Sequence, residues 1–296
     1  MQDHLPNAPN SPESEEGHHR GVSEGEGAHA DTFTDTFADT LDLERARDAQ
    51  ALLIAARPSR LKLGASVVGR LVRRFAKILL IAVLVWITAI VALVGVYAVD
   101  GVRPISTLML VDFARGKPVQ RRWVPFDQIA PSVWQSVVSS EDGKYCSHNG
   151  VDWEALNAVL DHALEGERTR GASTVPMQNA KNLFLWNSRS YIRKGVELPI
   201  ALLTDLVWSK RRQMEIYLNI AEWGEGIYGI EAAARHHFGR SARRLTRRQA
   251  ARLVASLPNP ILRRPARPTR GLRRIARTVE RRARVSGAYT ACLRKP

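Results

Sequence analysis

Two acidic residues and a set of cationic residues share the stretch between positions 141 and 219. Glu141 and Glu197 are of the type that can move a proton or hold a cation in place. The arginines and lysines near them are of the type that can hold a phosphorylated group. The clusters read Glu141-Asp142, His148-x-Gly150-x-Asp152, Gly171-x-Ser173-Thr174, Gln178-x-x-Lys181-Asn182, Arg193-Lys194-x-x-Glu197, Lys210 and Glu215-x-Tyr217-Leu218-Asn219. Together they predict proton transfer beside a phosphorylated group.

Glu141 follows apolar residues at helical spacing, so we expect it at the C-terminal end of a helix. The negative end of the helix dipole disfavours ionisation, and burial would add to that effect. We therefore predict a raised pKa and a role as proton acceptor. The alternative, which this motif alone favours, is that Glu141 and Asp142 only cap or hydrate a loop.

Glu197 lies beside Arg193 and Lys194 in helical projection. As a surface pair this arrangement would be weak. The functional interpretation is that an ionised carboxylate positions two cations, which then bind phosphate. Lys181 and Lys210 would add mobile positive charge, although both could equally lie on solvated helix surface.

The remaining polar residues of this stretch fall in predicted loops. We expect His148 to be a structural residue that braces Glu141 or Asp152, and not a catalyst. Ser173 and Thr174 follow a glycine, which suits a helix N-terminus whose backbone N–H groups meet an anion.

One long apolar segment predicts a membrane-spanning helix. From Ile78 to Val99 there is no charged residue, which gives about 22 residues and roughly 33 Å of helix, enough to cross a bilayer core. A buried core helix is the alternative, but such helices seldom run this far without a charge. Four basic residues in 70–77 precede it, so the positive-inside rule places the N-terminus in the cytoplasm. We expect a single-pass protein of the inner membrane whose main domain is periplasmic.

The chain is expected to have four parts. Residues 1–60 are predicted to be a disordered cytoplasmic tail, acidic over the first 45 and poor in large apolar side chains. Residues 61–77 form a basic juxtamembrane segment, 78–99 the transmembrane helix and 100–296 an extracytoplasmic domain with an Arg-rich C-terminal stretch. That domain is long enough for one well-buried core.

The extracytoplasmic part is predicted to be mainly helical. Helices are expected to end at Glu141, to begin after an N-cap at Asp152, and to begin at the Thr246–Gln249 capping box. Strand-like alternation is limited to Ser106–Val111 and Gln120–Val124.

Two apolar stretches outside the anchor are candidates for membrane contact. Residues 183–186, Leu-Phe-Leu-Trp, form either core or a lip that dips into the bilayer. Leu272, Ile275 and Val279 recur at helical spacing among arginines. We favour an interfacial helix on anionic head groups over a solvated basic tail.

The charge and the cysteines narrow the class of protein further. The net charge is +15, so nucleic acid, anionic lipid or a phosphorylated substrate would suit it, but the predicted topology excludes nucleic acid. Cys146 and Cys292 are the only cysteines and have no zinc-site spacing. A disulfide between them is conceivable outside the cytoplasm, but two free thiols are favoured because the sequence does not give their distance.

As an ordered set these motifs resemble the peptidoglycan glycosyltransferase family, in particular its monofunctional biosynthetic members with one N-terminal anchor. The resemblance covers roughly residues 125–260. It implies a mainly α fold, a lysozyme-like two-lobed helical domain preceded by a single transmembrane helix. It also implies a glycan-strand polymerase that acts on lipid II, a disaccharide-pentapeptide on undecaprenyl pyrophosphate.

The resemblance assigns a role to each motif. Glu141 would deprotonate the C4 hydroxyl of lipid II, whose oxygen attacks the anomeric carbon of the growing chain with inversion. Undecaprenyl pyrophosphate would leave against a cationic set that Glu197 organises, formed by Lys181, Arg193, Lys194 and Lys210. The other substrate-binding residues would be Asp142, Ser173, Thr174, Gln178 and Asn182, with His148 and Asp152 as structural support.

The implied partners are lipid II, the nascent strand, membrane lipid and other cell-wall synthesis or division proteins. No cofactor is required for certain. Mg²⁺ or another divalent cation at the pyrophosphate assists some family members, but its ligands are unknown from the sequence.

The sequence departs from the family pattern at a few positions. Gly143 stands where Arg is usual, Tyr145 replaces Phe, and Gln213-Met214 replaces an apolar pair. Pro176-Met177 replaces Thr-Gln, which puts some donor-side contacts and the rate in doubt. Two alternatives stay open: a lytic glycosidase of lysozyme-like fold, against which the cationic set argues, and an inactive membrane-anchored scaffold, against which the two retained glutamates argue.

Overall fold

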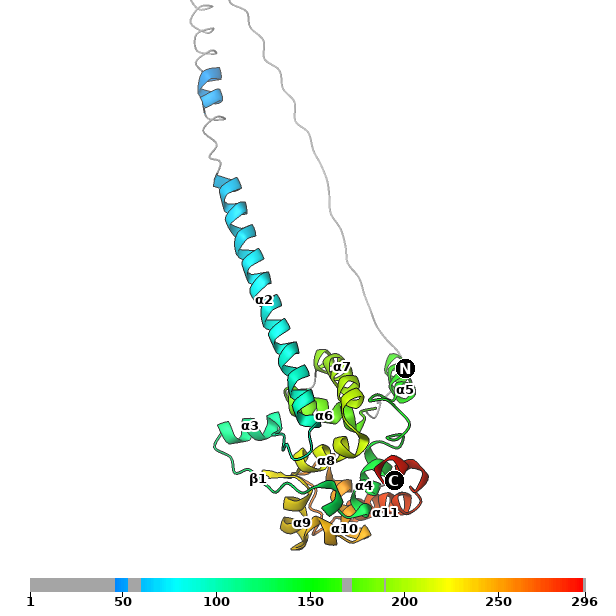
Figure 1. Ribbon diagram of the computed structural model, residues 1–296. Helices are drawn as coiled ribbons and strands as arrows, with labels where there is room; N and C mark the ends of the chain where they lie inside the picture. The colour runs from blue at the N-terminus through cyan, green and yellow to red at the C-terminus, as the bar shows by residue number, and fades with distance from the viewer. Residues whose placement is uncertain (1–45, 53–59, 167–171, 189, 295–296) are drawn as a thin grey trace, which may run out of the picture. The chain divides into compact units, whose positions relative to one another are not determined.

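The computed structural model describes residues 46–52, 60–166, 172–188 and 190–294 (Figure 1). The chain divides into two units, Met1–Phe75 and Ala76–Pro296. The described residues of the first unit are helical, at 46–52 and from Arg60 onward. The rest of the predicted tail, residues 1–45 and 53–59, lies outside the described residues.

The predicted membrane helix lies in α2, Arg60–Ala98. Its stretch long and apolar enough to cross a membrane is Val67–Ala98, which takes in all but the last residue of the predicted span. The helix also absorbs the basic segment 61–77. Large apolar side chains such as Leu79 and Val85 are exposed, as expected for a lipid-facing helix and not for a core helix.

The end of α2 packs within the second unit. Ile90 and Val94 are buried there. The indole Nε1 of Trp208 donates a hydrogen bond to the carbonyl of Val94 at 2.7 Å. The buried Arg212 guanidinium donates to the carbonyls of Tyr97 at 2.9 Å and Val102 at 2.5 Å. The last turn of the anchor, whose carbonyls lack helical partners, is therefore fixed by side chains of the domain.

Beyond the anchor the described chain is mainly helical, as predicted. The helices are α3 (Thr107–Ala114), α4 (Pro131–Glu141), α5 (Trp153–Leu164), α6 (Val175–Phe184), α7 (Tyr191–Val207), α8 (Lys210–Ile220), α9 (Ile230–Phe238), α10 (Arg247–Ser256) and α11 (Arg270–Arg284). Short 3₁₀ turns occur at η1 (Phe126–Gln128), η2 (Ala242–Arg244) and η3 (Ala288–Leu293). The strands are β1 (Gln120–Arg121), β2 (Glu222–Gly224) and β3 (Ile227–Tyr228).

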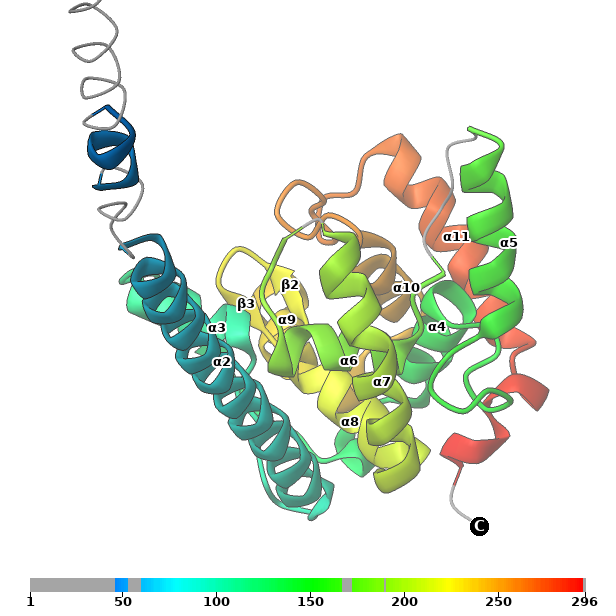
Figure 2. The ribbon, with the colours of Figure 1, turned by 90° about the horizontal axis from the view of Figure 1, so that it is seen from above.

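Two hydrophobic clusters meet on α8. One joins α4, α9, α10 and α11, and the other joins α6, α7 and the end of α2. Figure 2 shows α4, α10 and α11 of the first group side by side. Met214 and Leu218 of α8 face the first cluster, whereas Ile216 and Ile220 face the second. A helix that is buried on every side in this way belongs at the centre of a domain.

The three strands form a small sheet in the order β1-β3-β2. β1 pairs with β3 in parallel, with Gln120 opposite Ile227, and β2 pairs with β3 in antiparallel fashion. The strand predicted at Gln120–Val124 is thus present at its first two residues. The strand predicted at Ser106–Val111 is wrong: Ser106 caps α3 by accepting a hydrogen bond from the Met109 N–H at 3.2 Å, and a capped apolar run of this length forms a helix.

Several predicted helix boundaries are confirmed. α4 ends at Glu141. Asp152 accepts a hydrogen bond from the Ala155 N–H at 3.1 Å, as expected of an N-cap. The Thr246–Gln249 capping box is present at the start of α10.

The structure corrects the interfacial interpretation of the C-terminal stretch. Leu272 and Val279 are buried, with exposed fractions of 4% and 5%, and only Ile275 is exposed at 40%. α11 packs on α4 and α10. Its apolar face therefore completes the protein core and is not available to a bilayer; the periodicity that predicted an amphipathic helix did not say what would cover it.

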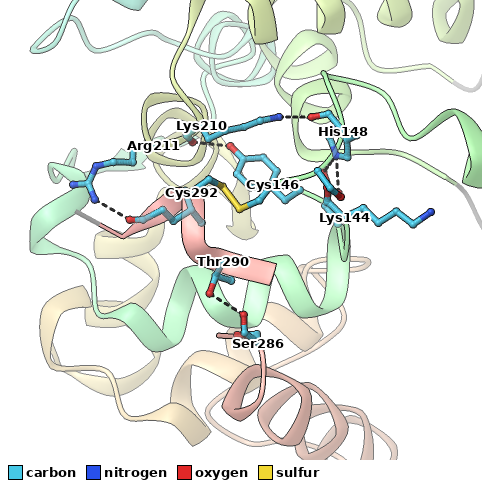
Figure 3. The surroundings of a disulfide bond; sticks show 12 residues. Lys144, Cys146, His148, Lys210, Arg211, Ser286, Thr290 and Cys292 are labelled. Atoms are coloured by element: carbon cyan, nitrogen blue, oxygen red, sulfur yellow. Dashed lines mark hydrogen bonds and ion pairs between the residues drawn. A yellow bond between two sulfur atoms is a disulfide. The ribbon is translucent and has the colours of Figure 1, made fainter. Parts of the chain in front are cut away.

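Cys146 and Cys292 form a disulfide, contrary to the favoured prediction of two free thiols (Figure 3). Their Cα atoms lie 5.7 Å apart although 146 residues separate them in sequence. Nearby, the Arg211 guanidinium donates to the carbonyl of Leu293 at 2.8 Å. The end of the chain is thereby joined to the loop that follows Glu141.

Reduction of this disulfide should destabilise the domain. Opening a crosslink over so long a loop costs about 2 to 5 kcal/mol of unfolding free energy, because the unfolded chain regains conformational freedom. We expect a lower thermal unfolding midpoint in the presence of a reductant. The Cys146→Ser/Cys292→Ser variant should begin at that lower midpoint and not respond to the reductant, and equal midpoints for wild type and variant would contradict the prediction.

Candidate active site

Glu141 lies at the edge of a cavity of about 490 Å³. Burial raises the pKa of its carboxyl, and the neighbouring Asp142 carboxylate adds to this effect. Hydrogen bonds from Ser140 and Gln178 act in the opposite direction, the first at 3.1 Å. The predicted raised pKa of Glu141 is confirmed, with desolvation as its main cause.

The same cavity receives several of the predicted site residues. Lys181, Asn182 and Gln178 reach it from α6, and Ser173 from the loop before that helix. Of the candidate residues, those that line the cavity with Glu141 are therefore Ser173, Gln178, Lys181 and Asn182.

Asp142 holds the loop that follows Glu141. Its buried carboxylate accepts hydrogen bonds from His148 Nε2 at 2.9 Å and from the Val175 N–H at 2.8 Å. His148 is thus structural, as predicted, but its partner is Asp142, not Glu141 or Asp152. A buried carboxylate needs such donors, and only the fold brings them within reach.

The N-terminus of α6 is closed by these contacts. The Val175 N–H binds Asp142, and the Met177 N–H donates to the Thr174 hydroxyl at 3.3 Å. Thr174 also donates to the carbonyl of Gly150 at 2.6 Å. These groups hold the helix in place, so the two N–H groups that we expected to meet an anion are already satisfied within the protein.

Gly150 allows this loop to pass close to α7. It has a φ of +86°, and a Cβ at this position would lie 2.8 Å from the carbonyl oxygen of Ala201. Any other residue would be strained there and would push the loop away from the helix.

The Pro176-Met177 departure lies away from the cavity. Pro176 is in the first turn of α6, where an N–H has no helical partner. Met177 is fully buried in the cluster around α6 and α7. Both residues therefore act on the packing of α6.

Glu197 is buried between two cations. Arg193 NH1 and Lys194 Nζ both contact its carboxylate, the second at 2.8 Å. Lys194 also donates to the Ser173 hydroxyl at 2.6 Å, which connects this group to the cavity lining. The predicted geometry of a carboxylate that organises two cations is present.

Lys181, Arg193 and Lys194 form one electrostatic cluster. Burial, followed by the charges of Arg193 and Lys181, lowers the pKa of Lys194 to about 8. Burial and Arg193 also lower the pKa of Lys181. Closely placed cations that are costly to charge are stabilised by an anionic ligand.

Lys210 has other partners. Its Nζ donates to the carbonyl of His148 at 2.7 Å (Figure 3). It also donates to the Asp205 carboxylate at 2.7 Å. The Tyr145 hydroxyl donates to the Lys210 carbonyl at 2.7 Å. The phenylalanine that is usual in the family at this position could not make this hydrogen bond. Gln213 donates to Asp205 at 2.8 Å. This network joins α8 to the loop after Glu141 and does not place Lys210 on the cavity lining.

Several residues at the cavity were not assigned a role from the sequence, although Tyr217 belongs to one of the quoted motifs. Tyr217 donates to Gln178 at 3.2 Å, and Glu222 carries a carboxyl whose pKa burial raises. Ser106 and Thr107 also line the cavity. They were assigned no role from the sequence because this segment was expected to be a strand. Trp186 is exposed at the cavity, whereas Leu183 and Leu185 are buried, so the apolar run 183–186 is mostly core.

Comparison with known sequences now assigns the chain to a class. The transglycosylase family matches residues 108–285. The biosynthetic peptidoglycan transglycosylase of Rhizobium meliloti is 61% identical over 202 residues, which is 68% of this chain and 86% of that protein. The protein of the same name from Agrobacterium fabrum is 56% identical over 221 residues, 75% of this chain and 98% of that protein. The Brucella suis protein is 60% identical over 204 residues, 69% and 91% respectively.

The family match and these relatives thus define a glycosyltransferase with a lysozyme-like domain, and the mainly helical fold agrees with it. The chain belongs to the transglycosylase family that polymerises peptidoglycan glycan chains. Among the residues that the structure describes, the one candidate membrane helix fits a single-pass inner-membrane anchor.

Replacement of His148 should destabilise the loop that follows Glu141. In His148→Ala the buried Asp142 carboxylate loses one donor, which we expect to cost about 1 to 3 kcal/mol of unfolding free energy. Denaturant unfolding measures this loss, and polymerisation should slow in parallel. His236→Ala, at an exposed histidine, is the matched control; equal stability of the two variants would contradict the structural role.

Proposed function

We propose that the protein extends a glycan strand by transferring the growing chain to lipid II. Glu141 accepts the proton of the C4 hydroxyl of lipid II as that oxygen forms a bond to the anomeric carbon of the donor chain. The bond from that carbon to the pyrophosphate breaks, and the configuration inverts from α to β. The observation that carries this proposal is that Glu141 and Lys181 line one cavity.

The leaving pyrophosphate is stabilised by Lys181, Arg193 and Lys194. Its charge develops as the bond breaks, so preorganised cations lower the barrier without a covalent intermediate. Glu197 keeps Arg193 and Lys194 in place. Lys210, bound to Asp205, supports the loop and the orientation of Glu141.

A divalent cation at the pyrophosphate stays a prediction. Within the described residues no group of three or more His, Cys, Asp or Glu side chains is arranged to hold a metal ion. The residues present therefore do not fit a protein-held cation, and no step of the proposed reaction requires one.

The anchor and the disulfide support a periplasmic location for the domain. Basic residues precede the apolar span, which favours a cytoplasmic N-terminus. Disulfides persist in oxidising compartments such as the periplasm and are rare in the cytosol. There the domain would meet lipid II at the membrane surface, along with membrane lipid and other cell-wall synthesis or division proteins.

The loss of the base is the direct test. Detergent-solubilised full-length protein is incubated with labelled lipid II, and the products are digested with lysozyme. We expect lysozyme-digestible polymer from wild type and a loss of at least roughly 100-fold in Glu141→Gln, since general base catalysis contributes that much. Gln135→Glu, one of the half-buried positions of α4, is a control for a change of charge on this helix. Polymer from Glu141→Gln at the wild-type rate, or release of muropeptides from finished cell wall, would contradict the proposal.

The pH dependence of kcat/KM should be bell-shaped. Glu141 must be ionised, so the rate rises with pH through its raised pKa. Lys194 must be charged, so the rate falls as pH passes through about 8. Lys194→Arg should move the basic limb to higher pH, because a guanidinium stays charged.

The matched control is Lys144→Arg. This lysine is exposed, and its nearest carboxylate partner is Glu154, which does not belong to the cation cluster. It should leave both limbs in place. A basic limb that stays near 8 in Lys194→Arg would show that another group controls it.

A further inference from the structure

Arginine is concentrated in the last part of the chain. Residues 232–296 contain 18 arginines, one lysine and a single acidic residue, Glu280. Like charges at this density repel one another and destabilise the folded state. This excess of positive charge would suit an anionic partner, and none of these arginines, all within the described residues, lines the cavity or contacts Glu197.

Six of these arginines form a stripe along α11, which we call the arginine stripe. With 3.6 residues per turn they fall on one face, and the buried residues Leu272, Ala276, Val279 and Ala283 fall on the opposite face. The helix has 15 residues, so the stripe is roughly 22 Å long. All six are exposed. They are Arg270, Arg273, Arg274, Arg277, Arg281 and Arg284.

The arginine stripe is almost unpaired. Among the residues that the structure describes, only Arg284 of the six has a carboxylate partner, Glu280 at 2.8 Å. Like-charge pairs three and four residues apart weaken a helix. A helix that keeps such pairs against its own local stability is a candidate binding surface.

In the sequence, the arginine stripe follows shortly after residues that line the cavity. Leu257, Pro258 and Pro260 line the cavity directly after α10. Arg263 follows and lowers the pKa of Glu141 by its charge, which sets it within electrostatic reach of the base. Exposed arginines at 264 and 267 then lead to the N-cap of α11. Basic residues thus follow one another along the chain from the cavity wall to α11.

The stripe is less suited to lipid. The apolar face of α11 is buried against α4 and α10, so of its large apolar residues only Ile275, exposed at 40%, could insert. Ile90 and Val94 of the anchor belong to the other hydrophobic cluster. The arginine stripe is therefore on a helix that packs on α4 and α10, whereas the end of the anchor packs in the cluster of α6 and α7.

We propose that the arginine stripe binds the peptide carboxylates of the nascent glycan strand as it leaves the cavity. This inference rests on the proposed function. Each added unit brings a pentapeptide with a free carboxylate terminus, so the strand is a repeating polyanion. Exposed guanidinium–carboxylate contacts are individually weak, but several together hold a strand while it slides from one to the next.

The test measures strand length separately from bond formation. Detergent-solubilised full-length protein and labelled lipid II are used without anionic lipid. For Arg273→Gln/Arg277→Gln we expect an unchanged initial rate of lipid II consumption and a mean strand length reduced roughly threefold, as loss of two exposed contacts speeds dissociation. Added salt should shorten the wild-type product more than the variant product.

Matched variants keep the result interpretable. Arg115→Gln/Arg122→Gln removes two exposed arginines outside the stripe and should leave strand length unchanged. Arg273→Lys/Arg277→Lys keeps the charges and should restore most of the length. Thermal unfolding midpoints equal to wild type confirm that each variant is folded.

A binding measurement identifies the anion. Soluble strands with their peptides should bind wild type more tightly than the same strands after enzymatic removal of the peptides, and the stripe variant should lose this difference. Wild-type length in the stripe variant, or a shortening that needs anionic lipid, would overturn the inference. Failure of wild type to make any polymer would instead contradict the proposed function.

Discussion

The site depends on two carboxylates that the fold keeps in opposite electrostatic surroundings. Glu141 is half-buried at the end of α4 with an acidic neighbour, so its negative charge is disfavoured. Glu197 is almost fully buried but contacts Arg193 and Lys194, so its negative charge is compensated. Pairs of ionisable groups separated in this way can divide the roles of acid, base and electrostatic support.

The helix α8 makes this separation possible. It is buried on both sides and joins the cluster that carries Glu141 to the cluster that carries the cations. Several of its buried polar groups are paired: Arg212 with Glu215 and with carbonyls at the end of the anchor, the Gln213 amide nitrogen with Asp205, and Asn219 with the backbone of Val124. Because buried polar groups are costly when unpaired, these contacts fix one arrangement of anchor, loop and cavity.

The sequence predicted those parts of the site that depend on local spacing. The helix end at Glu141, the cation pair around Glu197 and the anchor follow from periodicity over a few turns, and the structure contains all three. Two hydrogen bonds of the Asp142 carboxylate could not be predicted, one from His148 and one from the first N–H of α6, at Val175. These three residues come together only in the fold. The same limit explains the disulfide, whose two cysteines are 146 residues apart.

Two other errors have a common physical origin. Ser106–Val111 and the Leu272–Val279 stripe were each assigned from apolar periodicity without knowledge of what would cover the apolar face. In the structure α3 lies against α6 and α11 against α4 and α10. What covers an apolar face is set by tertiary contacts, which periodicity alone does not give.

The central claim is tested most directly by a titration of the Glu141 carboxyl. Carbon-13 NMR of protein labelled at glutamate carboxyls, with Glu141→Gln to identify the signal, gives its pKa. The account predicts a value above the ordinary glutamate value of 4.5. A pKa at or below 4.5 would contradict it, because Glu141 would then be an ordinary exposed carboxylate with no environment that suits a base.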